Sequence, residues 1–301
     1  MPHKKTLTVY LGSSGHTRPV FRESAKKMGS LIGANGMNLV YGGMDAGLMG
    51  IVAKAALDAG AEVTGVIPRR LKDSERMLEG ITETILVEEL CDRKKLMFLR
   101  ADAVITLPGG YGTMDEATEV LYWAKLGLHN KPLVLVNTEN FYDDAIKFLK
   151  GLPDFDDRNL IIVDGVEDVL PALDTWQAPP PPKKTPTHYP HFEDEITRDT
   201  AEPIIADKPS VENTYYVVCA LGLKQLGRHS RPIGFLNTDG QFDNLLAWIH
   251  RAAEEKFITP KCLELFSAAD NRDDLHAALG SQKQVNIDLH KLKWGPPPQD
   301  N

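Results

Sequence analysis

The chain has 301 residues, of which 42% are hydrophobic and 25% are charged, and it carries a formal net charge of −8 at pH 7. This length and balance are typical of a globular protein with one large or two small cores, and the negative charge argues against a general binder of nucleic acids or anionic membranes. The three distant cysteines, Cys91, Cys219 and Cys262, fit neither a disulfide framework nor a zinc site, so we expect a reducing cytoplasm. The first apolar run, residues 7–11, is too short for a signal peptide or a membrane span.

Apolar runs and amphipathic stretches alternate along the first 175 residues. Strands are expected at residues 6–11, 37–41, 62–67, 81–87, 103–107, 131–137 and 160–163. Helices are expected around residues 21–32, 51–56, 92–100, 117–126, 142–150 and 166–173, with a polar loop at 68–80. Strands that alternate with helices imply a parallel sheet covered on both faces. We therefore predict an α/β fold with a doubly wound, mostly parallel, Rossmann-like sheet.

The composition changes at residue 178. Four consecutive prolines, 179–182, open a stretch that we interpret as a semi-rigid extended linker over residues 177–203. It separates a nucleotide-binding domain, residues 1–176, from a smaller α/β unit, residues 204–290, and residues 291–301 are expected to form a polar tail.

The unit after the linker is a partial repeat of the first domain at an offset of 100. Seven residues recur, which are Leu126, Gly127, His129, Pro132, Asn137, Thr138 and Asp143, matched by Leu226, Gly227, His229, Pro232, Asn237, Thr238 and Asp243. Strands are expected in it at 232–237 and 262–267. So small a unit buries little surface, so we expect it to pack against a first domain, in its own chain or in a partner chain.

A glycine-rich turn follows the expected buried strand at 103–107. Gly109, Gly110 and Gly112 lack Cβ atoms, so backbone N–H groups can converge there on a ligand, and the next helix points its positive end at the same place. This pattern predicts a phosphate cradle at the carboxyl end of a strand, where open α/β sheets bind ligands. A turn that is glycine-rich for geometric reasons alone is the alternative.

The order Pro-Gly-Gly-x-Gly-Thr-x-x-Glu over residues 108–116 resembles the signature of the Lonely Guy family, the phosphoribohydrolases once labelled lysine decarboxylases. The resemblance extends over residues 6–175. It implies hydrolysis of the N-glycosidic bond of a nucleoside 5′-monophosphate, AMP or the N6-prenylated AMP of cytokinin metabolism, to the free base and ribose 5-phosphate. It also implies a homodimer and no cofactor or metal.

The resemblance assigns catalytic roles to Glu116 and Arg93, and each has a structural alternative. Thr113 and Glu116 also fit a T-x-x-E capping box, in which the Glu side chain only closes a helix start. Arg93 could belong to a solvated basic face at a helix start. The family's Arg-Lys pair usually follows Met-His-x, whereas here Arg93 and Lys94 follow Leu90-Cys91-Asp92, which leaves the preferred nucleobase open.

Two further turns complete the expected site. Gly12 and Ser13 end the first strand, and Gly42 and Gly43 resemble the family's second glycine motif, with Met44 in place of a third glycine. The residues expected to bind the substrate and its phosphate are Gly109, Gly110, Gly112, Thr113, Lys94, Gly12, Ser13, Gly42 and Gly43.

Other chemistries lack their motifs. The sequence contains no G-x-x-x-x-G-K-[ST], no H-E-x-x-H and no paired-cysteine motif, which argues against a P-loop enzyme and a zinc hydrolase. We find no context for a pyridoxal Schiff-base lysine, which argues against decarboxylation. Two rivals to the hydrolase remain, a nucleotide or molybdenum-cofactor carrier without hydrolysis and a structural protein whose first domain is catalytically idle.

Overall fold

The computed structural model describes residues 4–71, 76–183 and 186–295. Its main sheet has seven parallel strands in the order β4-β3-β2-β1-β5-β6-β7. The strands are β1 (Thr6–Tyr10), β2 (Asn38–Tyr41), β3 (Val63–Pro68), β4 (Glu83–Val87), β5 (Ala103–Thr106), β6 (Leu133–Val136) and β7 (Leu160–Val163). Strands β1, β5 and β6 are almost entirely buried, as expected for short apolar runs inside a parallel sheet.

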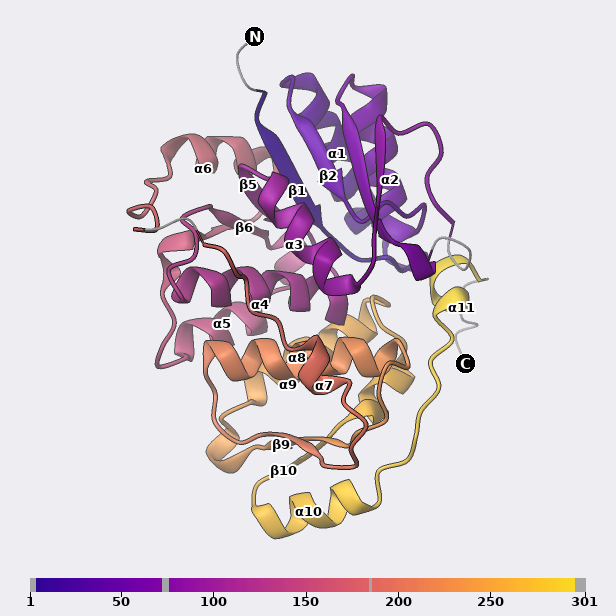
Figure 1. Ribbon diagram of the computed structural model, residues 1–301, viewed down its shortest axis with the longest axis vertical. Helices are drawn as coiled ribbons and strands as arrows, with labels where there is room; N and C mark the ends of the chain where they lie inside the picture. The colour runs from indigo at the N-terminus through magenta and orange to yellow at the C-terminus, as the bar shows by residue number, and fades with distance from the viewer. Residues whose placement is uncertain (1–3, 72–75, 184–185, 296–301) are drawn as a thin grey trace.

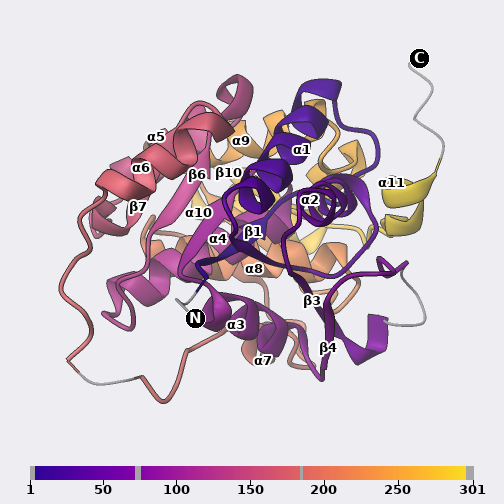
Figure 2. The same cartoon turned by 90° about the horizontal axis from the view of Figure 1, so that it is seen from above.

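Helices cover both faces of this sheet. They are α1 (Pro19–Ala34), α2 (Gly47–Asp58), α3 (Leu90–Arg100), α4 (Tyr111–Lys125), α5 (Asp143–Gly151) and α6 (Val169–Thr175). Helices α1 and α2 pack together on one face, and α3 and α4 lie on the other (Figure 2). The sheet therefore confirms the predicted doubly wound, Rossmann-like fold.

The strand order reverses its direction between β1 and β5. From β1 the chain moves outward through β2, β3 and β4, and it then returns to β5 on the other side of β1. The loops that leave the carboxyl ends of β1 and β5 must separate at this point, which opens a crevice for ligands. Gly12 and Gly109 lie in these two loops, and Gly12 N–H donates to the Pro108 carbonyl at 3.1 Å.

The C-terminal unit contains a separate parallel sheet in the order β10-β9-β8. Its strands are β8 (Ile204–Ala206), β9 (Ile233–Leu236) and β10 (Ser267–Ala269), and its helices are α8 (Val211–Gln225), α9 (Asp243–Glu254) and α10 (Arg272–Gly280). The expected strand at 262–267 was wrong, because Pro260–Leu265 forms a 3-10 helix and the strand begins at Ser267. Strand β8 was missed, because three residues are too few to show an alternating pattern.

The repeat is reproduced in the hydrogen bonds that the recurring residues make. The Asn137 amide donates to Asp143 and accepts from the Tyr142 N–H, both at 2.7 Å, and Asn237 makes the same two bonds with Asp243 and Phe242. The identities that recur at an offset of 100 therefore hold equivalent turns.

The two units pack through equivalent helices. Helix α8 lies against α4, its counterpart in the first unit, and α9 lies against α5 (Figure 1). Contacts between like elements are the mark of an approximate two-fold relation, as in a symmetric dimer. The expectation that the repeat packs against a first domain is confirmed, and the packing is within one chain.

The segment between the units is anchored rather than free. Tyr189 packs on Trp123 with ring centroids 5.0 Å apart, and the Trp123 indole donates to the Pro190 carbonyl at 2.8 Å. A short helix, α7 (Glu193–Ile196), follows. Aromatic packing and hydrogen bonds thus fix much of the stretch that the prolines alone predicted to be a linker.

The chain end also differs from the expectation of a polar tail. Residues 289–294 form helix α11 (Leu289–Trp294), which packs on the first unit, and residues 296–301 lie outside the described part of the chain. Residues 72–75 of the expected loop at 68–80 also lie outside it. In the described ranges, no helix is both long and apolar enough to cross a membrane.

Candidate active site

A cavity of about 280 Å³ opens at the carboxyl ends of β1 and β5. The first unit lines it with Leu11, Gly12, Ser13, Met44, Met49, Arg70, Leu71, Leu90, Arg93, Lys94, Gly110, Tyr111, Gly112, Thr113, Asp115 and Glu116. The C-terminal part of the chain adds Gly222, Leu223, Gln225, Leu226, Phe257, Ile258, Leu289, Leu292 and Lys293. Apolar walls with a few convergent charged groups are typical of small-molecule sites.

Helix α4 starts inside the glycine motif rather than after it. Its N-cap is Gly110 and its first residue is Tyr111, so Thr113 is the third helical residue and Glu116 the sixth. The capping-box interpretation of Thr113 and Glu116 was wrong, because a box needs the Glu at the third helical position. The residues at the start of α4, Gly110 to Thr113, line the cavity, which is where an anion-binding helix start would lie.

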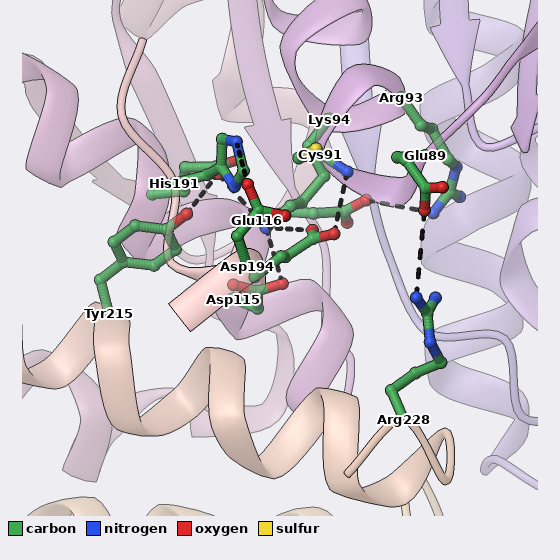
Figure 3. Close-up of polar contacts among 12 residues, drawn as sticks. Glu89, Cys91, Arg93, Lys94, Asp115, Glu116, His191, Asp194, Tyr215 and Arg228 are labelled. Carbon is green, nitrogen blue, oxygen red and sulfur yellow. Dashed lines mark hydrogen bonds and ion pairs between the residues drawn. The ribbon is translucent and has the colours of Figure 1, made fainter. Parts of the chain in front are cut away.

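The side chains of Arg93 and Glu116 point toward one another, and both residues line the cavity (Figure 3). The Arg93 Nη1 atom lies 3.7 Å from Glu116 Oε1, and both side chains are 11% exposed. The guanidinium is oriented by two carbonyls, since Nε donates to Val66 at 3.1 Å and Nη2 to Gly42 at 3.4 Å. Arg93 therefore lies on a buried wall of the site, and the interpretation of a solvated basic face was wrong.

Burial raises the pKa of Glu116 to about 7, against the opposing effect of the Arg93 guanidinium. Asp115 adds to the rise, and Lys94 opposes it. A carboxyl group with a pKa near neutral exchanges a proton at working pH, which is the property of tuned acids and bases in active sites.

Close packing explains why two positions, 42 and 109, are glycine. A Cβ on Gly42 would overlap the Arg93 guanidinium, and a Cβ on Gly109 would overlap the Thr113 side chain. Gly42 thus leaves room for the arginine rather than for a ligand. Gly43, at φ +78°, packs on Ile67 of β3 and serves the turn.

The structure brings most of the expected site residues to one cavity. Those that line it are Gly12, Ser13, Arg93, Lys94, Gly110, Gly112, Thr113 and Glu116. Gly109, Gly42 and Gly43 are not among the lining residues, although Gly109 packs against Thr113 and Gly42 against Arg93, which both line the cavity.

Lys94 is the centre of a buried charge network. Its ammonium lies 3.1 Å from Asp115, 3.2 Å from Glu119 and 3.5 Å from Glu193 of α7, and its side chain is 1% exposed. Burial alone would lower the pKa of Lys94, but Asp115 and Glu119 outweigh it and raise that pKa well above its usual range. The lysine expected to bind phosphate is instead held by three carboxylates, so we assign it to the support of the site.

The network joins both units behind the cavity (Figure 3). The Tyr215 hydroxyl of α8 donates to Glu119, whose pKa burial raises to about 8. Since Lys94 adjoins Arg93 and Asp115 adjoins Glu116 in the chain, the network fixes α3 and α4 relative to each other.

The C-terminal unit closes one side of the cavity. Phe257 packs on Gly12, where an added Cβ would come within 2.6 Å of its ring, and Ile258 packs on Gly110 with the same separation. Sequence reasoning missed these residues, because nothing about an apolar pair after a helix indicates which distant glycine turn it covers.

The second copy has no equivalent cradle. Lys208, Pro209 and Ser210 stand where the first copy has Pro108, Gly109 and Gly110. The Ser210 hydroxyl caps α8 by accepting from the Asn213 N–H at 3.1 Å, and Asp154 accepts from the Val211 N–H at 3.0 Å. Side chains of the protein thus occupy the anion-binding end of α8.

Fold and cavity together define an α/β protein with a candidate ligand site at the switch point of a doubly wound sheet. The chain belongs to the family described as "Possible lysine decarboxylase", whose model matches residues 49–172 and 217–279. The resemblance to Lonely Guy proteins predicted from the glycine motif is confirmed. The first matched segment lies in the first unit, and the second lies in the C-terminal unit that repeats part of it.

Three of the similar curated proteins come from the plants Oryza sativa and Arabidopsis thaliana. The chain is 41% identical over 146 residues to a probable cytokinin riboside 5′-monophosphate phosphoribohydrolase of Oryza sativa subsp. japonica, a match that spans 48% of this chain and 66% of that protein. A second rice protein of the same description is 38% identical over 175 residues, which is 56% of this chain and 76% of that protein. A cytokinin riboside 5′-monophosphate phosphoribohydrolase of Arabidopsis thaliana is 41% identical over 145 residues, spanning 48% and 64%.

Among solved structures, the chain is similar to a molybdenum cofactor binding protein from the phototrophic bacterium Rippkaea orientalis. The identity is 21% and the TM-score is 0.48, over 58% of this chain and 98% of that one. Within the described residues of the present chain, no group of three or more His, Cys, Asp or Glu side chains is arranged to hold a metal ion.

Proposed function

We propose that the protein hydrolyses the N-glycosidic bond of a nucleoside 5′-monophosphate to a free base and ribose 5-phosphate. The observation that carries this proposal is the buried Glu116 carboxyl beside Arg93, one and a half turns into the helix whose N-terminus forms the phosphate cradle. The names of the similar plant proteins support the same reaction.

The geometry suggests how the chain would work. The N–H groups of Gly112 and Thr113 and the dipole of α4 would hold the 5′-phosphate, which places the sugar beside Glu116. As the C1′–N bond breaks, the base leaves with the bonding electron pair and takes up a proton. The sugar then carries an oxocarbenium-like charge that the Glu116 carboxylate stabilises, and a water oxygen bonds to C1′ and releases its proton.

Arg93 would have two roles in this reaction. It holds Glu116 at 3.7 Å, and it would bind sugar or phosphate oxygens with its remaining N–H groups. Its anchoring to the Val66 and Gly42 carbonyls would preorganise it, so little reorganisation is needed at the transition state. Replacement of Arg93 by Ala should therefore lower turnover and weaken substrate binding.

For the base we propose adenine or an N6-modified adenine. Met44, Met49, Leu90, Leu223 and Leu226 line the cavity and offer an apolar surface of the kind that stacks on a purine or an alkyl substituent. The flank Leu90-Cys91-Asp92 differs from the family pattern, so the modification on the base is the open part of this proposal.

We also propose that residues 1–176 form the catalytic domain and that residues 204–290 replace part of a second subunit. Helix α4, which carries Glu116, is covered by α8 of the same chain. A dimer would therefore need another surface. The cytoplasmic location expected from the cysteines stays a prediction.

A panel of nucleoside 5′-monophosphates assayed for ribose 5-phosphate tests the reaction. AMP and N6-alkylated AMP should release it, and adenosine and ATP should be poor substrates. Absence of release from every monophosphate would contradict the hydrolase, and tight binding without turnover would favour the nucleotide carrier that the sequence left as the alternative.

A further inference from the structure

Helix α8 runs antiparallel to α4 and ends beside the start of that helix. In the first half of α8, the Tyr215 hydroxyl donates to Glu119, which lies in the third turn of α4. Near the end of α8, a Cβ added to Gly222 would lie 3.9 Å from the Cβ of Tyr111, the first residue of α4. The last turn of α8 therefore lies where the glycine cradle is.

From the start of α4 the chain passes to the start of α3. Arg228 follows the end of α8, and its Nη2 atom lies 3.9 Å from Oε2 of Glu89, the N-cap of α3 (Figure 3). The next residue, Leu90, is the first of α3 and lines the cavity. Residues 222–228 thus span the side of the cavity between the cradle and Leu90, which belongs to the flank that left the nucleobase open in the sequence.

One face of this last turn lines the cavity. The lining residues are Gly222, Leu223, Gln225 and Leu226, and their spacing of three and four residues places them on one side of the helix. Lys224 points away from the cavity, because its ammonium donates to the Leu265 carbonyl at 2.9 Å inside the second unit. Gln225 is therefore the polar member of an otherwise apolar stripe along the cavity wall.

The carboxamide of Gln225 is available to a ligand. It is half-buried, and within the described ranges of the chain it makes no hydrogen bond to another residue. The other uncharged polar side chains of the lining have assigned places, since Ser13 and Thr113 belong to the cradle and the Tyr111 hydroxyl donates to the Cys262 carbonyl at 3.2 Å. Small-molecule sites commonly use such a single polar group in an apolar wall to orient the ligand.

A carboxamide is suited to one edge of adenine. It presents an N–H donor and a carbonyl acceptor side by side, which match the N7 acceptor and the N6–H donor of adenine in a bidentate pair. An N6-alkylated adenine keeps one N6–H and so keeps a donor for the carbonyl. Hypoxanthine carries an oxygen at position 6 in place of the amino group, so the two bonds cannot both form.

We propose that Gln225 of the C-terminal unit hydrogen-bonds the base and selects 6-aminopurines over 6-oxopurines. The proposal rests on the proposed function in one respect, because it takes a nucleoside 5′-monophosphate as the ligand. The equivalent residue of the first copy is Lys125, which is paired with Asp154. The repeat thus has a different residue at this position, and it contributes specificity to a reaction whose catalytic groups lie in the first unit.

The test compares the wild type with Gln225→Met and Gln284→Met in the full chain. Methionine has the length of glutamine without its hydrogen-bonding groups. Gln284 is exposed and outside the cavity lining, so it is the matched control for the same substitution. Binding of AMP, inosine 5′-monophosphate (IMP) and ribose 5-phosphate is measured by calorimetry, and kcat/KM for AMP and IMP by release of ribose 5-phosphate.

We expect the wild type to bind AMP more tightly than IMP by roughly 10-fold or more, and Gln225→Met to lose most of that preference. The variant should bind AMP about 10-fold more weakly, with IMP and ribose 5-phosphate changed by less than about threefold. The ratio of kcat/KM for AMP and IMP should fall in parallel, and Gln284→Met should behave as the wild type. A purely structural role of Gln225 would weaken all three ligands alike.

Equal loss of AMP and ribose 5-phosphate affinity, or an unchanged preference for AMP over IMP in Gln225→Met, would overturn the proposal. A wild type that binds AMP and IMP equally, or binds neither, would overturn it as well. If the melting temperature shows that Gln225→Met does not fold, Gln225→Leu takes its place. The binding measurements separate these outcomes from failure of the proposed function. If the wild type prefers AMP through Gln225 but releases no ribose 5-phosphate, the base site stands and the hydrolase does not.

Discussion

Replacement of Glu116 by Gln should stabilise the folded protein at alkaline pH. Burial raises the pKa of this carboxyl from 4.5 to about 7, so ionising it in the folded chain is unfavourable. At 1.36 kcal/mol per pKa unit, the difference corresponds to about 3 kcal/mol, as an upper limit, by which ionised Glu116 destabilises the fold above pH 7. Gln has nearly the same volume and no charge, so it removes this penalty.

The sign of the effect sets its pH dependence. Because the pKa is raised on folding, the folded state binds the Glu116 proton more tightly than the unfolded state. The stability that comes from this tighter proton binding by Glu116 is fully present below about pH 4.5 and is lost as the pH rises through about 7. The Gln variant should therefore gain stability over the wild type at pH 8, and the gain should disappear near pH 5.

Thermal unfolding at the two pH values measures the effect, and we expect a rise of several degrees at pH 8. Glu62→Gln, at an exposed position, controls for removal of a negative charge from an acidic protein. A Gln variant that is less stable than the wild type at pH 8, or shifted equally at both pH values, would refute the reasoning. In that case the attraction between Arg93 and the ionised Glu116 carboxylate would outweigh the cost of burying that charge.

Three further predictions concern the pH dependence, the arginine and the second unit. The value of kcat/KM for AMP should rise as the pH increases through about 7, since the ionised form of Glu116 is needed; a profile that is flat after correction for the substrate phosphate, whose pKa is near 6, would contradict this. Gly42→Ala should lower kcat by roughly 10-fold or more, because the added methyl group displaces the Arg93 guanidinium. Gly151→Ala, which has open space around the added methyl group, should leave kcat unchanged. Equal kinetics of the two variants would argue against the role of Arg93. A fragment of residues 1–176 lacks α8 and Phe257, which cover the first unit, so it should melt at a lower temperature or self-associate, and it should lose activity. A fragment with the same melting temperature, association state and kinetics as the full chain would refute the packed arrangement.

The sequence predicted the sheet because its signals are local. Buried strands such as β5 and β6 are short apolar runs bounded by glycine, proline or polar residues, and all seven strands of the first unit were expected near their observed places. Helix α4 was expected to start at residue 117 but starts at Tyr111, because Tyr111 and Met114 are buried residues of its first turns inside the motif. The glycine pattern gave no indication that the helix begins inside the motif.

The parts of the site that were missed depend on packing between distant segments. Phe257 and Ile258 cover glycines more than 140 residues earlier, and no property of either residue indicates that contact. Lys94 was expected at the phosphate because it follows Arg93 in the chain. Adjacent residues of a helix point about 100° apart, so Arg93 faces the cavity and Lys94 turns toward carboxylates of α4 and α7.

Release of adenine and ribose 5-phosphate from AMP, followed together for the wild type and Glu116→Gln, tests the central claim most directly. Since Glu116 is not a helix cap, the substitution should change chemistry rather than the start of α4. The account predicts equal amounts of the two products from the wild type, and release slower by about 10²-fold or more from a variant that still binds AMP. Release at the wild-type rate by Glu116→Gln, or AMP binding without any release by the wild type, would contradict it.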